Sequence, residues 1–402
     1  MQNAVTVAIL VLAGAIAVLI IAAALIRVIR KMRQRRRDRL AAAPRRALLA
    51  FVADSGESGT DELLAIPPRA WQAVEPAAVE LLGKVRGDAH RALADVFEQR
   101  GVGDRALAQL TSRDPVRRAR AAEILGHLRR LHAVPEICGL LADRQPDVRV
   151  VAARALGAIG EPAAASPLLA SLTRPVPAHL VAHALARIGT GAVPALDAAL
   201  RDREPLIRTT ALDALGLIGA TRSVPGITEL LHDEQDPDVR LAAVRALGRL
   251  GGRSAVAPLL EVTELGNTDQ LRAAAARALG DIGAASASDA LAGLLDDPSY
   301  PVAHEAAQAL RRVGPAGIAH LTAVADDRPG RHAERQQVET GVPGSAGGVV
   351  GIGSEPISMP AAHARQALAL AALSAPAGRP VTPAPAAAPA PAAPPVRTGP
   401  TR

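Results

Sequence analysis

Aromatic side chains are almost absent from this 402-residue chain, where phenylalanine, tyrosine and tryptophan together make up 1% of the residues. Ordinary globular cores and ligand pockets depend on such side chains, so the apolar mass must come from alanine, leucine, valine and isoleucine. Small aliphatic side chains suit helices that stack closely and bury area by repetition. The composition therefore favours a repetitive helical protein and gives little support to a small-molecule enzyme.

Cysteine and lysine are also scarce. The one cysteine, Cys138, excludes an internal disulfide framework and a thiolate metal cluster, and it fits a reducing compartment. It lies in the apolar run 137–141, so we expect a small buried residue there. Lysine occurs only at Lys31 and Lys84. Arginine otherwise carries the positive charge, a bias that points to a GC-rich bacterial genome.

The net charge of +7 is concentrated in one segment. Residues 27–46 hold ten basic residues and one acidic residue, a net +9, which leaves −2 for the rest of the chain. Nucleic-acid binding depends on positive charge spread over the binding surface and, for single strands, on stacking aromatics. The near-neutral remainder therefore disfavours a nucleic-acid partner.

Val5 to Ile26 is an uncharged run of 22 residues, which as a helix would be about 33 Å long and would match the roughly 30 Å of membrane hydrocarbon. A block of positive residues follows, from Arg27 to Arg39. Such residues stay in the cytoplasm, so we expect a single-pass inner (plasma) membrane protein with its N-terminus outside and its bulk cytoplasmic. A cleavable signal peptide is the alternative, but it would carry its charges before the apolar run.

Between Arg113 and about Ala325 the sequence repeats every 29 to 32 residues, a period typical of stacked helical pairs. Seven units share one register, marked by the leucines 125, 156, 185, 215, 247, 279 and 310. Three residues after each leucine stands another aliphatic residue, and alanines recur three and four positions before it. This spacing predicts one apolar face on each helix.

Glycine follows the apolar face of six of the seven units, where it predicts a left-handed helix end; Arg129 is the exception. An arginine stands seven residues before the leucine in most units, as in Asp147-Val148-Arg149. We expect acids about six residues earlier to accept hydrogen bonds from these guanidinium groups. The expected acceptors, within one repeat or between two, are Asp143, Asp202, and either Asp233 or the neighbouring Asp236. The third and seventh units have Ala178 and Ala303 in place of the arginine, which predicts interruptions of the series.

The Asp, Val-Arg, Ala-Ala, Ala-Leu-Gly and Ile-Gly pattern resembles the HEAT-like repeats that are also found in phycobilin lyases. The resemblance covers about half of the chain. It implies an all-α fold, a right-handed alpha-alpha superhelix (HEAT/armadillo-like solenoid), here with one N-terminal transmembrane helix. It also implies two antiparallel helices per unit, with the Val-Arg helix on the concave side.

Composition divides the chain into seven segments. We expect a transmembrane anchor (1–26), a basic juxtamembrane segment (27–47), a helical N-terminal cap (48–112), HEAT-like repeats (113–326), a flexible loop (327–360), a terminal helix (361–374) and a disordered Pro/Ala tail (375–402). Trp71 lies in the cap, where we expect it to anchor the helices.

Familiar chemical motifs are weak in this sequence. His179 and His183 have the spacing of a two-histidine zinc helix, but neither the accompanying acid nor a third ligand is evident. The glycines at 347–353 lack the strand and the Lys-Ser/Thr of a phosphate loop. No serine or cysteine nucleophile has a paired base. We therefore expect no enzyme activity, cofactor, metal or small-molecule substrate.

A polar column recurs two residues before and two after each leucine, positions that share one helix face. Its members are Glu123 and His127, Arg154 and Ala158, His183 and Arg187, Asp213 and Leu217, Arg245 and Arg249, Arg277 and Asp281, and Gln308 and Arg312. The plain interpretation is a solvated helix face. As a set, the column predicts a partner-binding surface, for which we single out Arg154, His183, Arg187, Asp213, Arg245, Arg249, Arg277 and Asp281.

The expected function is a membrane-tethered scaffold or accessory subunit that binds a protein partner in its concave groove. Varied charges along such a groove select an acidic or amphipathic peptide. The resemblance also allows a bilin-lyase-like enzyme, although the sequence offers no aromatic pocket for a tetrapyrrole. A nucleic-acid-binding HEAT-like protein is the third and least favoured alternative.

Overall fold

A computed structural model describes residues 42–51, 59–326 and 359–374, with the isolated positions 25, 27, 31 and 32, and these ranges contain helices and turns but no strand. No helix within these ranges is both long and apolar enough to cross a membrane. The predicted span Val5 to Ile26 lies outside them except for Leu25, and most of the predicted loop and the whole tail also lie outside. The chain divides into two compact units, Met1–Ile282 and Gly283–Arg402.

Residues 42–51 are helical, and α2 (Thr60–Ala65), α3 (Pro68–Lys84), α4 (Gly87–Gln99) and α5 (Val102–Gln109) follow before the repeats of the first unit. Trp71 of α3 is buried and meets the Phe97 ring of α4 edge to face, with 5.4 Å between the ring centroids. The Arg100 guanidinium lies 4.2 Å from the indole centroid and donates to three backbone carbonyls in and just after α2. Trp71 thus joins the helices of this region, as its position in the sequence predicts.

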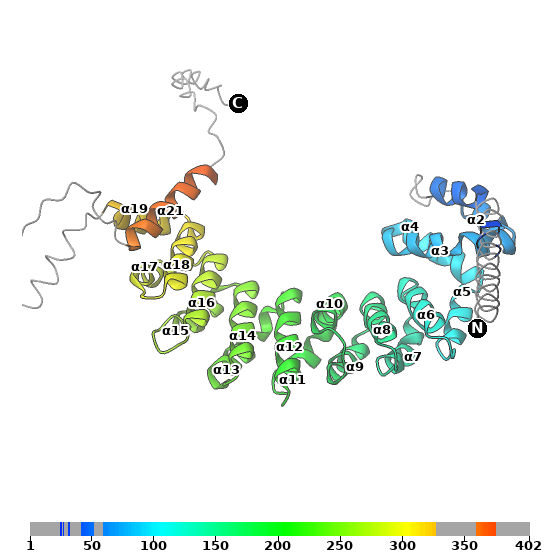
Figure 1. Cartoon of the computed structure of the whole chain (residues 1–402), viewed down its shortest axis with the longest axis horizontal. Helices are drawn as coiled ribbons and strands as arrows, with labels where there is room; N and C mark the ends of the chain where they lie inside the picture. Colours follow the sequence, from blue (N-terminus) through cyan, green and yellow to red (C-terminus); the bar gives the residue numbers. More distant parts are fainter. Residues whose placement is uncertain are drawn as a thin grey trace, which may run out of the picture. The chain divides into compact units, whose positions relative to one another are not determined.

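Helical pairs follow in the first unit (Figure 1), with one helix of each pair on the concave side and one on the convex side. The inner helices are α6 (Pro115–His127), α8 (Pro146–Ile159), α10 (Ala178–Ile188), α12 (Pro205–Ile218), α14 (Pro237–Leu250) and α16 (Asp269–Ile282). The outer helices are α7 (Val134–Leu140), α9 (Ala165–Ala170), α11 (Val193–Ala199), α13 (Val224–Asp233) and α15 (Arg253–Val262). The Val-Arg helices are the inner ones, which confirms the expectation drawn from the resemblance.

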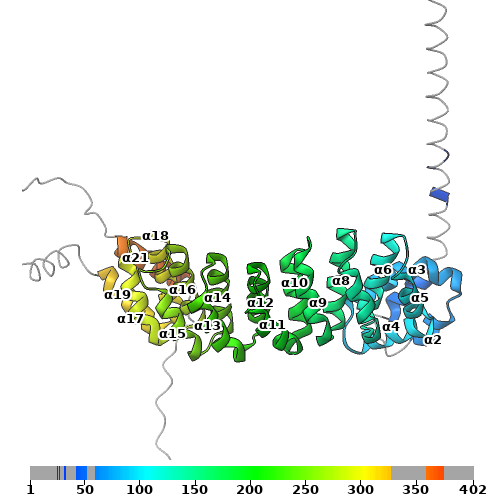
Figure 2. The ribbon, with the colours of Figure 1, turned by 90° about the horizontal axis from the view of Figure 1, so that it is seen from below.

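Short 3-10 turns lead into the outer helices, and one extends α9. They are η1 (Leu131–Ala133), η2 (Pro162–Ala164), η3 (Ser171–Thr173), η4 (Gly189–Ala192) and η5 (Thr221–Ser223). Successive repeats form one row of helices, as the second view shows (Figure 2). Such an arrangement buries each repeat against its neighbours.

The ends of the inner helices follow from their sequence. Proline occupies the first turn of α6, α8, α12 and α14, where its missing N–H is not needed. Asp114 and Asp236 also cap their helices by accepting backbone N–H groups. The predicted glycines, such as Gly160 and Gly219, have positive φ, and Arg129 adopts the same region with φ 51°. The left-handed helix end is confirmed at Gly160 and Gly219, whereas Gly189, Gly251 and Gly314 combine a positive φ with an extended ψ. The exception, Arg129, costs backbone strain.

Leucine forms the centre of the core in every repeat. The seven leucines of the register are 0% exposed, and the residues three and four positions before them are also buried. The aliphatic residues three positions after the leucines are buried or half-buried. The predicted apolar face is therefore confirmed, and a HEAT-like all-α solenoid results.

The second unit contains α17 (Ser288–Gly293), α18 (Tyr300–Val313), α19 (Pro315–Asp326), α21 (Met359–Ser374) and the 3-10 turns η6 (Ala285–Ala287) and η7 (Leu294–Asp296). Helix α21 packs against α18 and α19. His363 of α21 is buried, with its ring centroid 4.7 Å from that of Tyr300. Burial, with help from nearby His304, lowers the pKa of His363.

Candidate partner-binding groove

The arginines seven residues before each leucine connect neighbouring repeats. Arg118 of α6 donates from Nε and Nη2 to the two carboxylate oxygens of Asp143, at 2.7 and 2.9 Å. Its Nη1 donates to the backbone carbonyl of Ser112 within its own repeat. The hydrogen bonds from Arg118 hold the pKa of Asp143 below its usual range. Asp143 is thus an acceptor as predicted, and its donor belongs to the preceding repeat.

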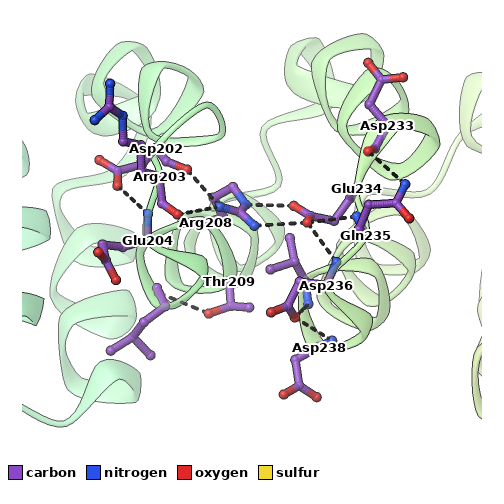
Figure 3. Close-up of polar contacts among 12 residues, drawn as sticks. Asp202, Arg203, Glu204, Arg208, Thr209, Asp233, Glu234, Gln235, Asp236 and Asp238 are labelled. Carbon is purple, nitrogen blue, oxygen red and sulfur yellow. Dashed lines mark hydrogen bonds and ion pairs between the residues drawn. The ribbon is translucent and has the colours of Figure 1, made fainter.

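The same clamp recurs at Arg208, but its acceptor is a glutamate outside the predicted set. Arg208 donates from Nε and Nη2 to Glu234, at 2.7 and 3.0 Å, and both side chains are largely buried (Figure 3). Asp202 contributes its backbone carbonyl to Arg208, while its carboxylate accepts the N–H of Glu204. Asp236 caps α14, while Arg208 and Arg240 donate to Glu234 and Asn267. The prediction that the carboxylate of Asp202, and that of Asp233 or Asp236, accepts these guanidinium groups is therefore wrong.

Two further inner arginines use other acceptors. Arg149 donates to the backbone carbonyls of Asp143 and Pro175, and Arg240 donates from Nη2 to Asn267 Oδ1 at 2.7 Å. The contacts of Arg149 with Pro175 and of Arg240 with Asn267 join one repeat to the next. The contact of Arg149 with Asp143 stabilises a turn within its own repeat. The arginine series is therefore structural, and it leaves the inner faces of the helices available for binding.

The polar column lies on those inner helices and faces solvent. Of the eight predicted site residues, Asp213 is half-buried and the others are exposed. Arg154 is on α8, His183 and Arg187 on α10, Asp213 on α12, Arg245 and Arg249 on α14, and Arg277 and Asp281 on α16. The structure thus places all eight on the inner-helix side, divided between two regions.

The first region is a groove across α6, α8 and α10 with a volume of about 420 Å³. Its floor consists of small or aliphatic residues, including Gly126, Ala155 and Ala184. Its polar rim consists of Glu123, His127, Arg154, His183 and Arg187. A second hollow of about 290 Å³ between α3 and α6 shares Glu123 and His127 with this groove. We call the first hollow the α6–α10 groove; three of the predicted site residues meet there.

Positive charge predominates on the rim. Arg154 and Arg187 are opposed by one acid, Glu123, within the groove. His127 is half-buried, and burial lowers the pKa of its imidazole, so the ring is neutral at pH 7. Its backbone carbonyl accepts a hydrogen bond at 2.9 Å from His90 Nε2. The fixed charges therefore favour an anionic segment, and the floor of Gly and Ala lets that segment approach closely.

The second region lies on α12, α14 and α16, where the sequence predicts a basic cluster of Arg245, Arg249 and Arg277. Arg249 Nη1 lies 3.1 Å from Asp213 Oδ1, and both side chains are partly exposed. This ion pair neutralises one of the three arginines, so the cluster is less basic than its sequence suggests. The α6–α10 groove is the stronger candidate site.

The remaining candidate residues do not assemble into a site within the described residues. His179 and His183 are both exposed on α10, and no group of three potential metal-binding side chains occurs among the residues that the structure describes. Cys138 is half-buried on α7, and burial raises the pKa of its thiol. The glycines at 347–353 lie outside the described residues.

A family model described as HEAT repeats matches residues 103–186, 173–248, 193–278, 224–311 and 256–338, which together span more than half of the chain. This chain belongs to the HEAT-repeat family. The family explains the repeat period, the paired helices and the buried leucine register. No curated protein matches it in sequence.

Several solved structures resemble this HEAT-repeat chain. The complex of CpcE and CpcF of phycocyanin lyase from Nostoc sp. is 27% identical, covers 55% of this chain and 92% of its own, and has a TM-score of 0.29. Human deoxyhypusine hydroxylase is 20% identical, with coverage of 81% and 99% and a TM-score of 0.27. Kap121p is 16% identical, with coverage of 82% and 39% and a TM-score of 0.44. At these TM-scores none of the three bears on what this chain binds.

Proposed function

We propose that this HEAT-repeat protein is a scaffold that binds an acidic or amphipathic segment of a protein partner in the α6–α10 groove. The supporting observation is the convergence of Arg154, His183 and Arg187 on one groove whose floor consists of small or aliphatic residues. A helix or an extended peptide can lie on such a floor, while the arginines select its charge. HEAT solenoids in general bind proteins, which agrees with this role.

The scaffold is further proposed to be tethered to the inner face of the plasma membrane, with its N-terminus outside. The support is the sequence alone: the apolar run from Val5 to Ile26 and the positive block from Arg27 to Arg39. Tethering raises the effective concentration of the groove near other membrane proteins. A modest affinity of the groove for its protein partner is then enough for binding. In this role the chain would be an accessory subunit of a membrane complex.

Charge reversal in the groove tests the binding role. The double variant Arg154→Glu and Arg187→Glu should lose the partner that co-purifies with the full chain from native membranes, as identified by mass spectrometry. The control is Arg253→Glu, an exposed arginine at the start of the outer helix α15. Equal partner recovery from both variants, with unchanged circular dichroism, would rule out the groove as the binding surface.

Membrane association is tested separately by fractionation. The full chain should remain with the membrane pellet after washing at alkaline pH, while a chain that begins at residue 42 should be released. If the full chain is also released, the tether is wrong, although the groove can still bind its partner.

A further inference from the structure

A cavity of about 510 Å³ lies between the outer helices α11 and α13, away from the α6–α10 groove. Apolar groups from Leu200, Gly226 and Leu230 form part of its wall. Gly226 has no side chain to fill the space, and Leu200 is the nearest neighbour to a Cβ at that position, at 3.8 Å. The cavity is large enough for a side chain or a small organic ligand.

Ser223, which lines this cavity, carries a buried hydroxyl group where the other repeats have a methyl group. The residue that directly precedes the outer-helix core is alanine in the other repeats, and all of these alanines are 0% exposed: Ala133, Ala164, Ala192, Ala255 and Ala287. Ser223 is 4% exposed and lines the cavity, and its Oγ has no hydrogen-bond partner among the described residues. A buried hydroxyl without a partner destabilises the fold, so its presence calls for a ligand or an ordered water.

Asp197 on the opposite wall departs from the repeat in the same way. The equivalent positions of the other outer helices hold Cys138, Leu169, Thr228, Leu260 and Ala292, none of which is a carboxylate. Asp197 lines the cavity, and its buried Oδ1 also lacks a hydrogen-bond partner among the described residues. Two departures from the repeat pattern therefore bring two acceptor groups to one cavity.

The charges around the cavity favour a cation. Arg208 is paired with Glu234, and Arg201 lies 3.1 Å from Glu229. The remaining charged residues that line the cavity are Asp197, Asp202 and Asp233 and one further arginine, Arg222. Asp202 Oδ1 is partly occupied because it accepts the N–H of Glu204. The cavity therefore combines an excess of negative charge with two unused acceptors.

We propose that this cavity binds an alkylammonium or alkylguanidinium group. The charged head would be held by Asp197 Oδ1 and Ser223 Oγ, while the methylene stem would lie on Leu200, Gly226 and Leu230. A lysine or arginine side chain of another protein carries such a group, and so does a free polyamine. Sites that break a repeat rule in this way lose stability for the sake of binding.

The test uses two substitutions that remove the acceptors and retain the repeat fold. Ser223→Ala restores the alanine of the other repeats, and Asp197→Asn removes the charge at constant size. Isothermal titration of the full-length chain in detergent is carried out with N-acetyl-arginine methylamide, as the side-chain probe, and with spermidine, as the polyamine. Glu136→Gln on the exposed side of α7 is the control for lost surface charge.

We expect at least one probe to bind, and we expect its affinity to fall at least tenfold in both cavity variants and to be unchanged in Glu136→Gln. The probe that binds more tightly identifies the source of the cation. Ser223→Ala should also raise the melting temperature by about 2–4 °C, because the unpartnered hydroxyl is removed. The proposal is overturned if neither probe binds, if the cavity variants bind as well as the parent, or if Ser223→Ala lowers the melting temperature, which would indicate a structural water.

Discussion

Gly157 of α8 packs directly on Ala184 of α10: a Cβ atom added to Gly157 would lie 2.7 Å from the Ala184 Cα. Gly126 has the same relationship to Ala155, at 2.8 Å. The glycine of the Ala-Leu-Gly pattern therefore sets how closely neighbouring inner helices approach. It has a different task from the glycines that end these helices.

Gly157→Ala should destabilise the protein by about 1–3 kcal/mol, because the new methyl group forces the backbones of α8 and α10 apart. Urea unfolding followed by circular dichroism measures the change. Gly139→Ala on α7 is the matched control, since no atom lies within 4 Å of its added Cβ. This control should be stabilising by about 0.5–1 kcal/mol, as expected for a helical glycine. Similar losses in both variants would contradict the close-packing explanation.

The Arg118–Asp143 clamp predicts a loss of stability in acid. Asp143 has a lowered pKa in the folded state, so its contribution is present above the unfolded value of about 3.9 and is lost as the pH falls through the folded value. Asp143→Asn should cost about 1–3 kcal/mol at pH 7, and the difference should shrink steadily as the pH falls below the unfolded value of about 3.9. Urea midpoints at both pH values measure this convergence. Asp147→Asn, an exposed neighbour, should show no comparable difference.

Arg129 carries backbone strain that a single substitution can relieve. It is the one non-glycine residue with positive φ in the described part of the chain, and it is exposed. Arg129→Gly should stabilise the protein by about 0.5–1 kcal/mol, the left-handed penalty less the added freedom of glycine in the unfolded chain. The reciprocal variant Gly160→Ala should be destabilising by about 1 kcal/mol. Thermal unfolding should show a higher melting temperature for Arg129→Gly and a lower one for Gly160→Ala.

Arg100 links Trp71 to α2 and should not be replaceable by lysine. Its Nη2 donates to the carbonyls of Leu63, Leu64 and Ile66 while the guanidinium lies over the indole, and burial lowers the pKa of this arginine. Lysine lacks the planar fork, so Arg100→Lys should destabilise by about 1–3 kcal/mol. Fluorescence of Trp71, the single tryptophan, follows the unfolding. Arg69→Lys on the exposed side of α3 is the control and should match the parent.

The repeat pattern predicts most of the fold because each column of the repeat has one physical task. A leucine that recurs at one register is buried in every unit, and a glycine after the apolar face ends the helix. The acceptor of the Arg208 clamp was equally available: Glu234 lies six residues before Arg240, as Asp143 lies six before Arg149. The predicted acceptors were all aspartates, so the prediction missed that Glu234 occupies the same repeat position as Asp143.

The α6–α10 groove and the cavity between α11 and α13 could not be predicted from the repeat pattern. Periodicity shows which side of a helix faces solvent, but it does not show which side chains of neighbouring helices meet. The pairing of Arg249 with Asp213 joins residues 36 positions apart, and it depends on the offset between α12 and α14. Cavities depend similarly on which residues of two neighbouring repeats lie opposite each other, as Gly226 and Leu200 do.

Ala178 stands where the other inner helices of the first unit carry an arginine, so α10 lacks the guanidinium that the repeat pattern places at this position. The first, second, fourth and fifth repeats are each bonded to the next repeat through Arg118, Arg149, Arg208 or Arg240. A row of repeats bends most easily at the interface that has the fewest hydrogen bonds between neighbouring repeats. Bending should therefore be easiest between α10 and the fourth repeat. A ligand bound in the α6–α10 groove can then alter the curvature of the row of repeats at that interface.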